Sequence, residues 1–127
     1  MNPADLRYDR EHEWVRVEGA AAVIGISDFA QDQLGEVVYV DLPSAGDELV
    51  AGDTFGEIES VKSVSELFAP VSGTVLEVND DLDAAPESIN SDPYGAGWMV
   101  KIALADPSQL DALMSAGDYD SFVANEA

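Results

Sequence analysis

Ten glycines and six prolines interrupt this chain of 127 residues so often that long helices are disfavoured over most of its length. The stretches between them are short and rich in Val, Ile and aromatic residues, as in "EWVRV", "AVIGI", "VVYV" and "TVLEV". Such runs, bounded by Gly, Pro and Asp, predict β-strands. The sequence therefore predicts a mainly β fold. With 46% hydrophobic residues, we expect one domain over residues 1–127 with its own core.

A short helix is predicted after the first two strands. Ser27 is a suitable N-cap, and Phe29, Ala30 and Leu34 follow at near-helical spacing. Gly35 stands where a glycine commonly ends a helix, so the helix is expected over residues 28–34.

Two further helices are predicted near the C-terminus. Asp106 followed by Pro107 is typical of a helix start, and this helix is expected to reach about Met114. Asp118 is expected to cap a second helix that continues through Phe122.

Lys62 is one of only two lysines in the chain, and it lies between two short extended runs. Residues 55–60 and 64–69 predict a hairpin with this lysine exposed at the tip. An ordinary solvated lysine and a lysine that carries a modification both fit this position. A catalytic amine fits less well, because an exposed lysine among the carboxylates of Glu57, Glu59 and Glu66 stays protonated.

The formal net charge of −21 excludes nucleic acid and anionic membranes as partners, since both would repel the chain. Concentrated salt screens such self-repulsion, so we expect a halophilic protein from a salt-accumulating cell, with an ordinary acidic protein as the alternative. No run reaches the ~18 apolar residues of a membrane span, and the start lacks the pattern of a signal peptide. A cytoplasmic location is therefore expected.

The chain has no cysteine and a single histidine, His12. The composition excludes disulfides, thiolate metal sites and a multi-histidine metal site within one chain. We expect no metal site and no protein thiol in redox chemistry, and a structural role for His12.

Four segments, in order, resemble the glycine cleavage H-protein family. They are "EHEWVRVEG", "IGISDFAQDQLGEVVYVDLP", "GEIESVKSVSELFAPVSGTVLEVN" and "INSDPYGAGWMVKI". The resemblance extends from Leu6 to about Phe122. It implies a barrel-sandwich hybrid of β-strands, as in lipoyl domains, with the helices predicted above.

The function implied by this resemblance is carriage, not catalysis. Lys62 is expected to bear a covalent lipoyl group, with Glu59, Ser60, Val61 and Ser63 supporting the attachment hairpin. This arm would carry the aminomethyl group of glycine from the P-protein to the T-protein and be reoxidised by the L-protein. A lipoate-attaching enzyme is the fourth implied partner.

The resemblance also places Glu13 and Glu66 in a groove that holds the cationic aminomethyl group, with Glu11 as a further candidate. Solvated acidic surface is the alternative for all three residues. Gln33 stands where many relatives have histidine, which puts a histidine contribution to the groove in doubt.

Three alternative functions remain open from the sequence. Biotin carriers have a similar hairpin but usually flank their lysine with methionines, whereas Val61 and Ser63 stand here. A lipoyl donor in lipoate relay and an unmodified binding module would both keep the same fold.

Overall fold

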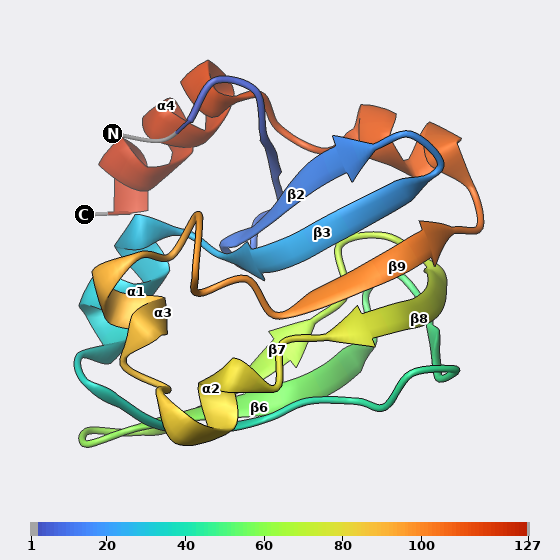
Figure 1. Ribbon diagram of the computed structural model, residues 1–127. Helices are drawn as coiled ribbons and strands as arrows, with labels where there is room; N and C mark the ends of the chain where they lie inside the picture. The colour runs from blue at the N-terminus through green and yellow to red at the C-terminus, as the bar shows by residue number, and fades with distance from the viewer. Residues whose placement is uncertain (1–2, 127) are drawn as a thin grey trace.

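The computed structural model describes residues 3–126 and contains two antiparallel sheets (Figure 1). The strand order is β1-β2-β3-β9-β8-β5 in the larger sheet and β4-β6-β7 in the smaller one. The strands are β1 (Arg7–Tyr8), β2 (Glu13–Glu18), β3 (Ala21–Ile26), β4 (Val37–Asp41), β5 (Glu48–Leu49), β6 (Thr54–Ser60), β7 (Val64–Phe68), β8 (Gly73–Val78) and β9 (Val100–Leu104). The mainly β prediction is confirmed.

The main core is built by side chains that alternate along the strands. Val15 of β2, Ile24 of β3, Ile58 of β6, Leu67 of β7 and Ile102 of β9 belong to one cluster of buried residues. Successive side chains of a strand point to opposite faces, so every second residue enters this cluster. Full burial of each such side chain contributes about 1.5–3 kcal/mol to folding.

A second cluster covers the other face of the larger sheet. Trp14 and Val23 point to this side and pack with Tyr8 and with Tyr119 of the C-terminal helix α4 (Ala116–Glu126). The rings of Tyr8 and Tyr119 stack with centroids 4.6 Å apart and planes 6° apart. Strands β2 and β3 are therefore buried on both faces, and α4 is part of the folded core.

The helix predicted after the first strands is confirmed as α1 (Asp28–Leu34). The Ala30 N–H donates to Ser27 Oγ at 3.1 Å, and Gly35 ends the helix with a φ of 81°. Two short helices that were not predicted, α2 (Asp81–Ala84) and α3 (Ser88–Ser91), follow β8. Helix α3 lies beside α1 (Figure 1).

The C-terminal prediction needs two corrections. Asp106 does begin a helix, with its side chain accepting the Ser108 N–H, but this is a 3-10 helix over Pro107–Ala112 that ends before Met114. Asp118 is not the cap of the last helix. The Asp118 N–H donates to Ser115 Oγ at 3.2 Å, so α4 begins earlier and continues to Glu126.

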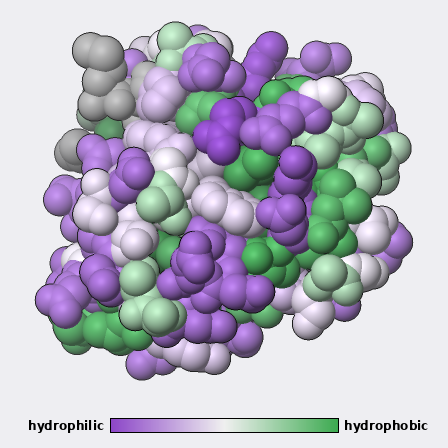
Figure 2. All heavy atoms as spheres, in the orientation of Figure 1, coloured by the Kyte–Doolittle hydropathy of each residue, from purple (hydrophilic) through white to green (hydrophobic). Residues whose placement is uncertain are grey.

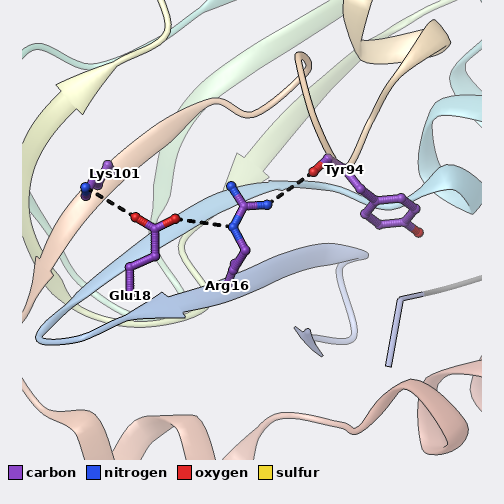
Figure 3. A network of polar contacts seen from close by, with 4 residues as sticks. All are labelled: Arg16, Glu18, Tyr94 and Lys101. Atoms are coloured by element: carbon purple, nitrogen blue, oxygen red, sulfur yellow. Dashed lines mark hydrogen bonds and ion pairs between the residues drawn. The ribbon is translucent and has the colours of Figure 1, made fainter. Parts of the chain in front are cut away.

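One polar network on the larger sheet includes two of the five basic residues (Figure 3). Lys101 of β9 and Arg16 of β2 contact the Glu18 carboxylate at 3.3 and 3.4 Å. The hydrogen bond from Lys101, followed by that from Arg16, lowers the pKa of Glu18. Arg16 also donates to the Tyr94 carbonyl at 3.2 Å and thereby joins β2 to the loop before β9.

Candidate functional site

The turn between β6 and β7 is a compact four-residue turn braced by Ser60. The Ser60 N–H donates to the Ser63 carbonyl at 2.8 Å, and Ser60 Oγ accepts the N–H groups of Lys62 and Ser63, both at 3.2 Å. The Val61 N–H donates to the Glu36 carbonyl at 3.0 Å, which ties the turn to the loop after α1. The structure thus places Lys62 at the tip of a hairpin whose backbone is fixed.

The Lys62 side chain is exposed and lies across the end of α1. A Cβ built on Gly35 would lie 3.2 Å from Lys62 Cε and 3.8 Å from Nζ, so a glycine leaves room for the lysine stem. Neither an ion pair nor a hydrogen bond within residues 3–126 holds the Lys62 ammonium. The amine is therefore available to another molecule.

Exposed apolar side chains flank this lysine. Val61 is 66% exposed and Val64 58% exposed. Figure 2 shows hydrophobic surface at the lower left, where Figure 1 places the hairpin tip. Exposed apolar side chains beside an accessible amine are typical of a surface that another protein binds.

A cleft of about 540 Å³ begins beside Lys62, between α1 and strand β7. Ser63 and Val64 form its rim at the hairpin. Its apolar lining includes Ile26, Phe29, Ala30, Leu34 and Leu67, and its polar lining includes Glu11, His12, Glu13, Gln33 and Glu66. The structure therefore brings the three predicted groove residues, Glu11, Glu13 and Glu66, to one cavity near Lys62.

Glu13 differs from the other two because it is only 1% exposed, whereas Glu11 and Glu66 are exposed. One carboxyl oxygen, Oε2, accepts the Phe68 N–H at 3.2 Å. The other, Oε1, is buried with no hydrogen-bond partner among the described residues. Burial, followed by the neighbouring Asp9, raises the pKa of Glu13 to about 11, so this group is an uncharged acid at neutral pH.

Asp9 shapes the turn that carries Glu13, and the sequence analysis did not identify it. Its Oδ1 accepts the N–H groups of Glu11 at 3.0 Å and Glu13 at 2.9 Å. Burial also raises the Asp9 pKa. In the same turn, His12 has a φ of 72°, a conformation that residues other than glycine rarely adopt.

His12 contributes to the wall of the cleft and is bonded to the C-terminal helix. Its Nδ1 lies 2.8 Å from the Tyr119 hydroxyl, which lies 2.6 Å from Ser27 Oγ. These contacts give His12 the structural role that was expected for it. Metal binding is not supported, because residues 3–126 contain no group of three His, Asp or Glu that could hold an ion.

These features together define a class of protein. A sandwich of two β-sheets presents one lysine, unpaired among residues 3–126, on a rigid hairpin, and a cleft lies beside the hairpin residues Ser63 and Val64 that follow it. The helices described in residues 3–126 include none with the length and hydropathy needed to cross a membrane. The arrangement is that of a small β carrier domain.

Comparison with known proteins identifies the family. The family model for the glycine cleavage H-protein matches residues 6–126. Relatives named glycine cleavage system H protein include one from Anaeromyxobacter sp. (strain K), 60% identical over 98% of this chain and 97% of its own length. Another, from Carboxydothermus hydrogenoformans, is 51% identical over 98% of this chain and 95% of its own length. The chain belongs to the glycine cleavage H-protein family.

A solved structure supports the same assignment. The crystal structure of a glycine cleavage system H protein from Mycobacterium marinum matches with a TM-score of 0.83 and 37% identity, over 94% of this chain and 97% of that one. The expected barrel-sandwich fold is confirmed. Family membership also confirms the carrier role in glycine cleavage, the lipoate cofactor and the non-catalytic character that the resemblance implied.

Proposed function

We propose that Lys62 is the residue that carries the lipoyl group, and that the adjacent cleft shelters the aminomethyl group while it is carried. The observation that supports this most directly is the position of Lys62. Its side chain is exposed, its amine is unpaired among residues 3–126, and its turn is fixed by Ser60; the next two residues of the hairpin, Ser63 and Val64, line the cleft that contains Glu13. A carrier needs both a free attachment point and a nearby shelter.

The residues around Lys62 suit the cofactor. When bound, lipoate supplies a disulfide that accepts the aminomethyl group and must later be reoxidised. The apolar side of the cleft, which includes Phe29, Ala30 and Leu34, fits an aliphatic arm. Because the chain has no cysteine, no protein thiol competes in disulfide exchange with the arm.

The residues beside Lys62 have separate roles in this proposal. Ser60 fixes the turn, while the exposed side chains of Val61 and Ser63 are the features that a lipoate-attaching enzyme meets first. Glu59 lies opposite Val64 on the exposed side of the hairpin and supplies negative charge for the same recognition.

The cationic aminomethyl amine is held by the polar part of the cleft. Glu13 Oε1 is a buried oxygen that accepts no N–H or hydroxyl group among the described residues, so it can accept a hydrogen bond from a ligand in exchange for the contact between the Glu13 and Asp9 carboxyl groups. Glu11 and Glu66 line the same cleft and add negative charge at its exposed side. The apolar part of the wall, which includes Phe29, Leu34 and Leu67, limits the access of water to the amine.

Residues 1–127 act as one carrier domain that works in turn with the P-protein, the T-protein and the L-protein. These enzymes approach the same hairpin, because Lys62 is the single attachment point in this proposal. The charge of −21 requires basic docking surfaces on them, since electrostatic complementarity guides such encounters.

We place this carrier in the cytoplasm of a salt-accumulating cell. Asp41, Glu57 and Glu66 lie directly opposite one another across β4, β6 and β7, and all three are exposed. Like charges that face each other across strands destabilise a sheet. Molar salt shortens the Debye length to about 3 Å and removes this repulsion.

The attachment residue is tested by replacing each of the two lysines in turn. Lys62→Arg protein from the native host should lack the lipoyl mass increment and should not support aminomethyl transfer. Lys101→Arg is the matched control, because it keeps the charge that pairs with Glu18 and should be lipoylated normally. Undiminished transfer by Lys62→Arg would refute the proposal.

The cleft is tested by loading the arm with methylamine and measuring release of ammonia or formaldehyde. Glu13→Gln should release them faster than the parent chain. Glu77→Gln changes an exposed carboxylate outside the cleft lining and should leave the rate unchanged. An unchanged rate in Glu13→Gln would remove that residue from the groove.

A further inference from the structure

We propose that Tyr119 of α4 is a positioning residue for the cleft, since one hydroxyl group joins two elements that line it. The inference rests on the proposed function of the cleft as a shelter for the carried group. It assigns the C-terminal helix, which lies outside the cleft, to the carrier site.

The two contacts of the hydroxyl reach different elements. On one side, Tyr119 Oη lies 2.8 Å from Nδ1 of His12, in the turn that precedes β2 and holds Glu13. On the other side it lies 2.6 Å from Oγ of Ser27, the residue that caps α1. Both the turn and α1 contribute lining residues, so the hydroxyl links two walls of the cleft.

The hydroxyl is itself held in place. Tyr119 is fully buried, and its ring stacks on that of Tyr8 with centroids 4.6 Å apart. The His12 ring lies 5.0 Å from the ring of Phe29, an apolar residue of the cleft lining, and 5.7 Å from that of Phe122. A rigid donor and acceptor group in a packed site fixes its partners more narrowly than a solvated one.

Ser27 Oγ takes part in two hydrogen bonds, one with α1 and one with Tyr119. Ser27 Oγ already accepts the Ala30 N–H at 3.1 Å, so the same oxygen serves the helix cap and the contact with Tyr119. The tyrosine hydroxyl has one proton and can also accept, so it can bond both partners at once. Removing it leaves the α1 cap and the ring contact between His12 and Phe29 in place, and it removes the hydrogen-bonded link between Ser27 and His12.

The His12 conformation explains why this link is needed. A φ of 72° is unfavourable for a residue with a side chain, and such a conformation persists only where surrounding contacts hold it. His12 directly precedes Glu13, so freedom at His12 moves the buried carboxyl group. The position of Glu13 relative to α1 thus depends on a residue more than a hundred positions later in the chain.

The test compares Tyr119→Phe with Tyr8→Phe. Each variant removes one hydroxyl from the same aromatic stack, but the Tyr8 hydroxyl donates to the Pro3 carbonyl at 2.7 Å and does not contact the cleft. Both proteins are lipoylated, checked by intact mass and loaded with methylamine. Tyr119→Phe loses both hydrogen bonds of the hydroxyl and should release ammonia about fivefold faster than Tyr8→Phe, the factor that corresponds to about 1 kcal/mol.

A second measurement uses the unmodified chain. Amide hydrogen exchange should accelerate at His12 and Glu13 in Tyr119→Phe and stay unchanged there in Tyr8→Phe. If Tyr119→Phe does not fold, Ser27→Gly replaces it, because glycine is tolerated at an N-cap; this change removes one of the two Tyr119 contacts together with the cap bond from the Ala30 N–H.

The outcomes separate the two proposals. Absence of a lipoyl group on Lys62 in the parent chain would overturn the proposed function. Normal lipoylation with equal release and equal exchange in the two tyrosine variants would overturn the role of Tyr119 alone.

Discussion

Asp9 and Glu13 form a pair of carboxyl groups in one turn, Glu13 buried and Asp9 half-buried, with the Glu13 N–H donating to Asp9 Oδ1 at 2.9 Å. Burial raises the pKa of both groups, and each lies near the other. Neither forms an ion pair with a Lys or Arg side chain in the described chain. The pair is therefore stable only while it retains protons, which makes the folded state sensitive to alkali.

The first prediction concerns how the stability of the folded chain depends on pH. The Glu13 pKa rises from 4.5 to about 11 on folding, so the folded chain binds more protons than the unfolded chain between these values. The protonated Glu13 side chain therefore makes its full contribution to the free energy of unfolding below pH 4.5. This contribution is lost as the pH rises, by up to about 1.4 kcal/mol per pH unit. In denaturant unfolding at constant salt, Glu13→Gln should gain stability relative to the parent chain from pH 6 to 8. A constant difference would contradict the assignment.

The second prediction concerns the brace of the hairpin. Ser60→Ala removes the oxygen that accepts the Lys62 and Ser63 N–H groups. The loss should be about 1–2 kcal/mol in urea unfolding, with faster amide exchange at residues 61–63. Ser63→Ala serves as the control, because the Ser63 side chain is exposed and makes no contact like that of Ser60. Equal effects of the two changes would show that the Ser60 hydroxyl does not hold the turn.

The third prediction separates backbone strain from crowding of Lys62. Gly35→Ala and Gly19→Ala both place a Cβ at positive φ, at an expected cost of ~1–3 kcal/mol each, with the larger cost at Gly35, whose ψ of −157° lies in a region that glycine alone adopts readily. Only the new Cβ at Gly35 meets Lys62, 3.2 Å from Cε, while that at Gly19 has open space around it. Lipoylation by the attaching enzyme should slow in Gly35→Ala alone, as followed by intact mass. Similar lipoylation rates for both variants would mean that the Lys62 side chain does not lie against residue 35 during modification.

The fourth prediction concerns salt. The parent chain should melt at a higher temperature in molar KCl than in dilute buffer, because screening removes repulsion within the row of Asp41, Glu57 and Glu66. Glu57→Gln at the centre of this row should stabilise the chain by about 0.5 kcal/mol in dilute buffer and have little effect in molar KCl. Glu77→Gln lies outside the row and is the control. Melting that does not respond to KCl would remove the halophilic interpretation.

The regular elements were predictable from local signals. The α1 helix has both a capping serine and a terminating glycine, and the β6–β7 hairpin has extended runs around a short turn. Helices α2 and α3 have only four residues each, too few for a periodic pattern to emerge. Strand β1 consists of two residues and depends on its partner β2, so its own sequence carries almost no signal.

The site was predictable in part. The lysine, its turn and the residues near the cleft follow from sequence order, but the burial of Glu13 depends on packing between distant strands. One sequence feature did indicate that Glu13 is buried. Glu13 and Val15 lie two residues apart in β2 and so face the same side of the sheet, and Val15 is buried in the core. The roles of Asp9 and Tyr119 arise from contacts across a turn and across the whole chain, which composition and spacing do not encode.

The protonated state of Glu13 has a thermodynamic consequence for loading. A carboxylic acid that receives a cationic amine gives up its proton, so uptake of the aminomethyl group is coupled to proton release into the solvent. The heat of loading then depends on the ionisation enthalpy of the buffer, and mild acidity opposes uptake by mass action.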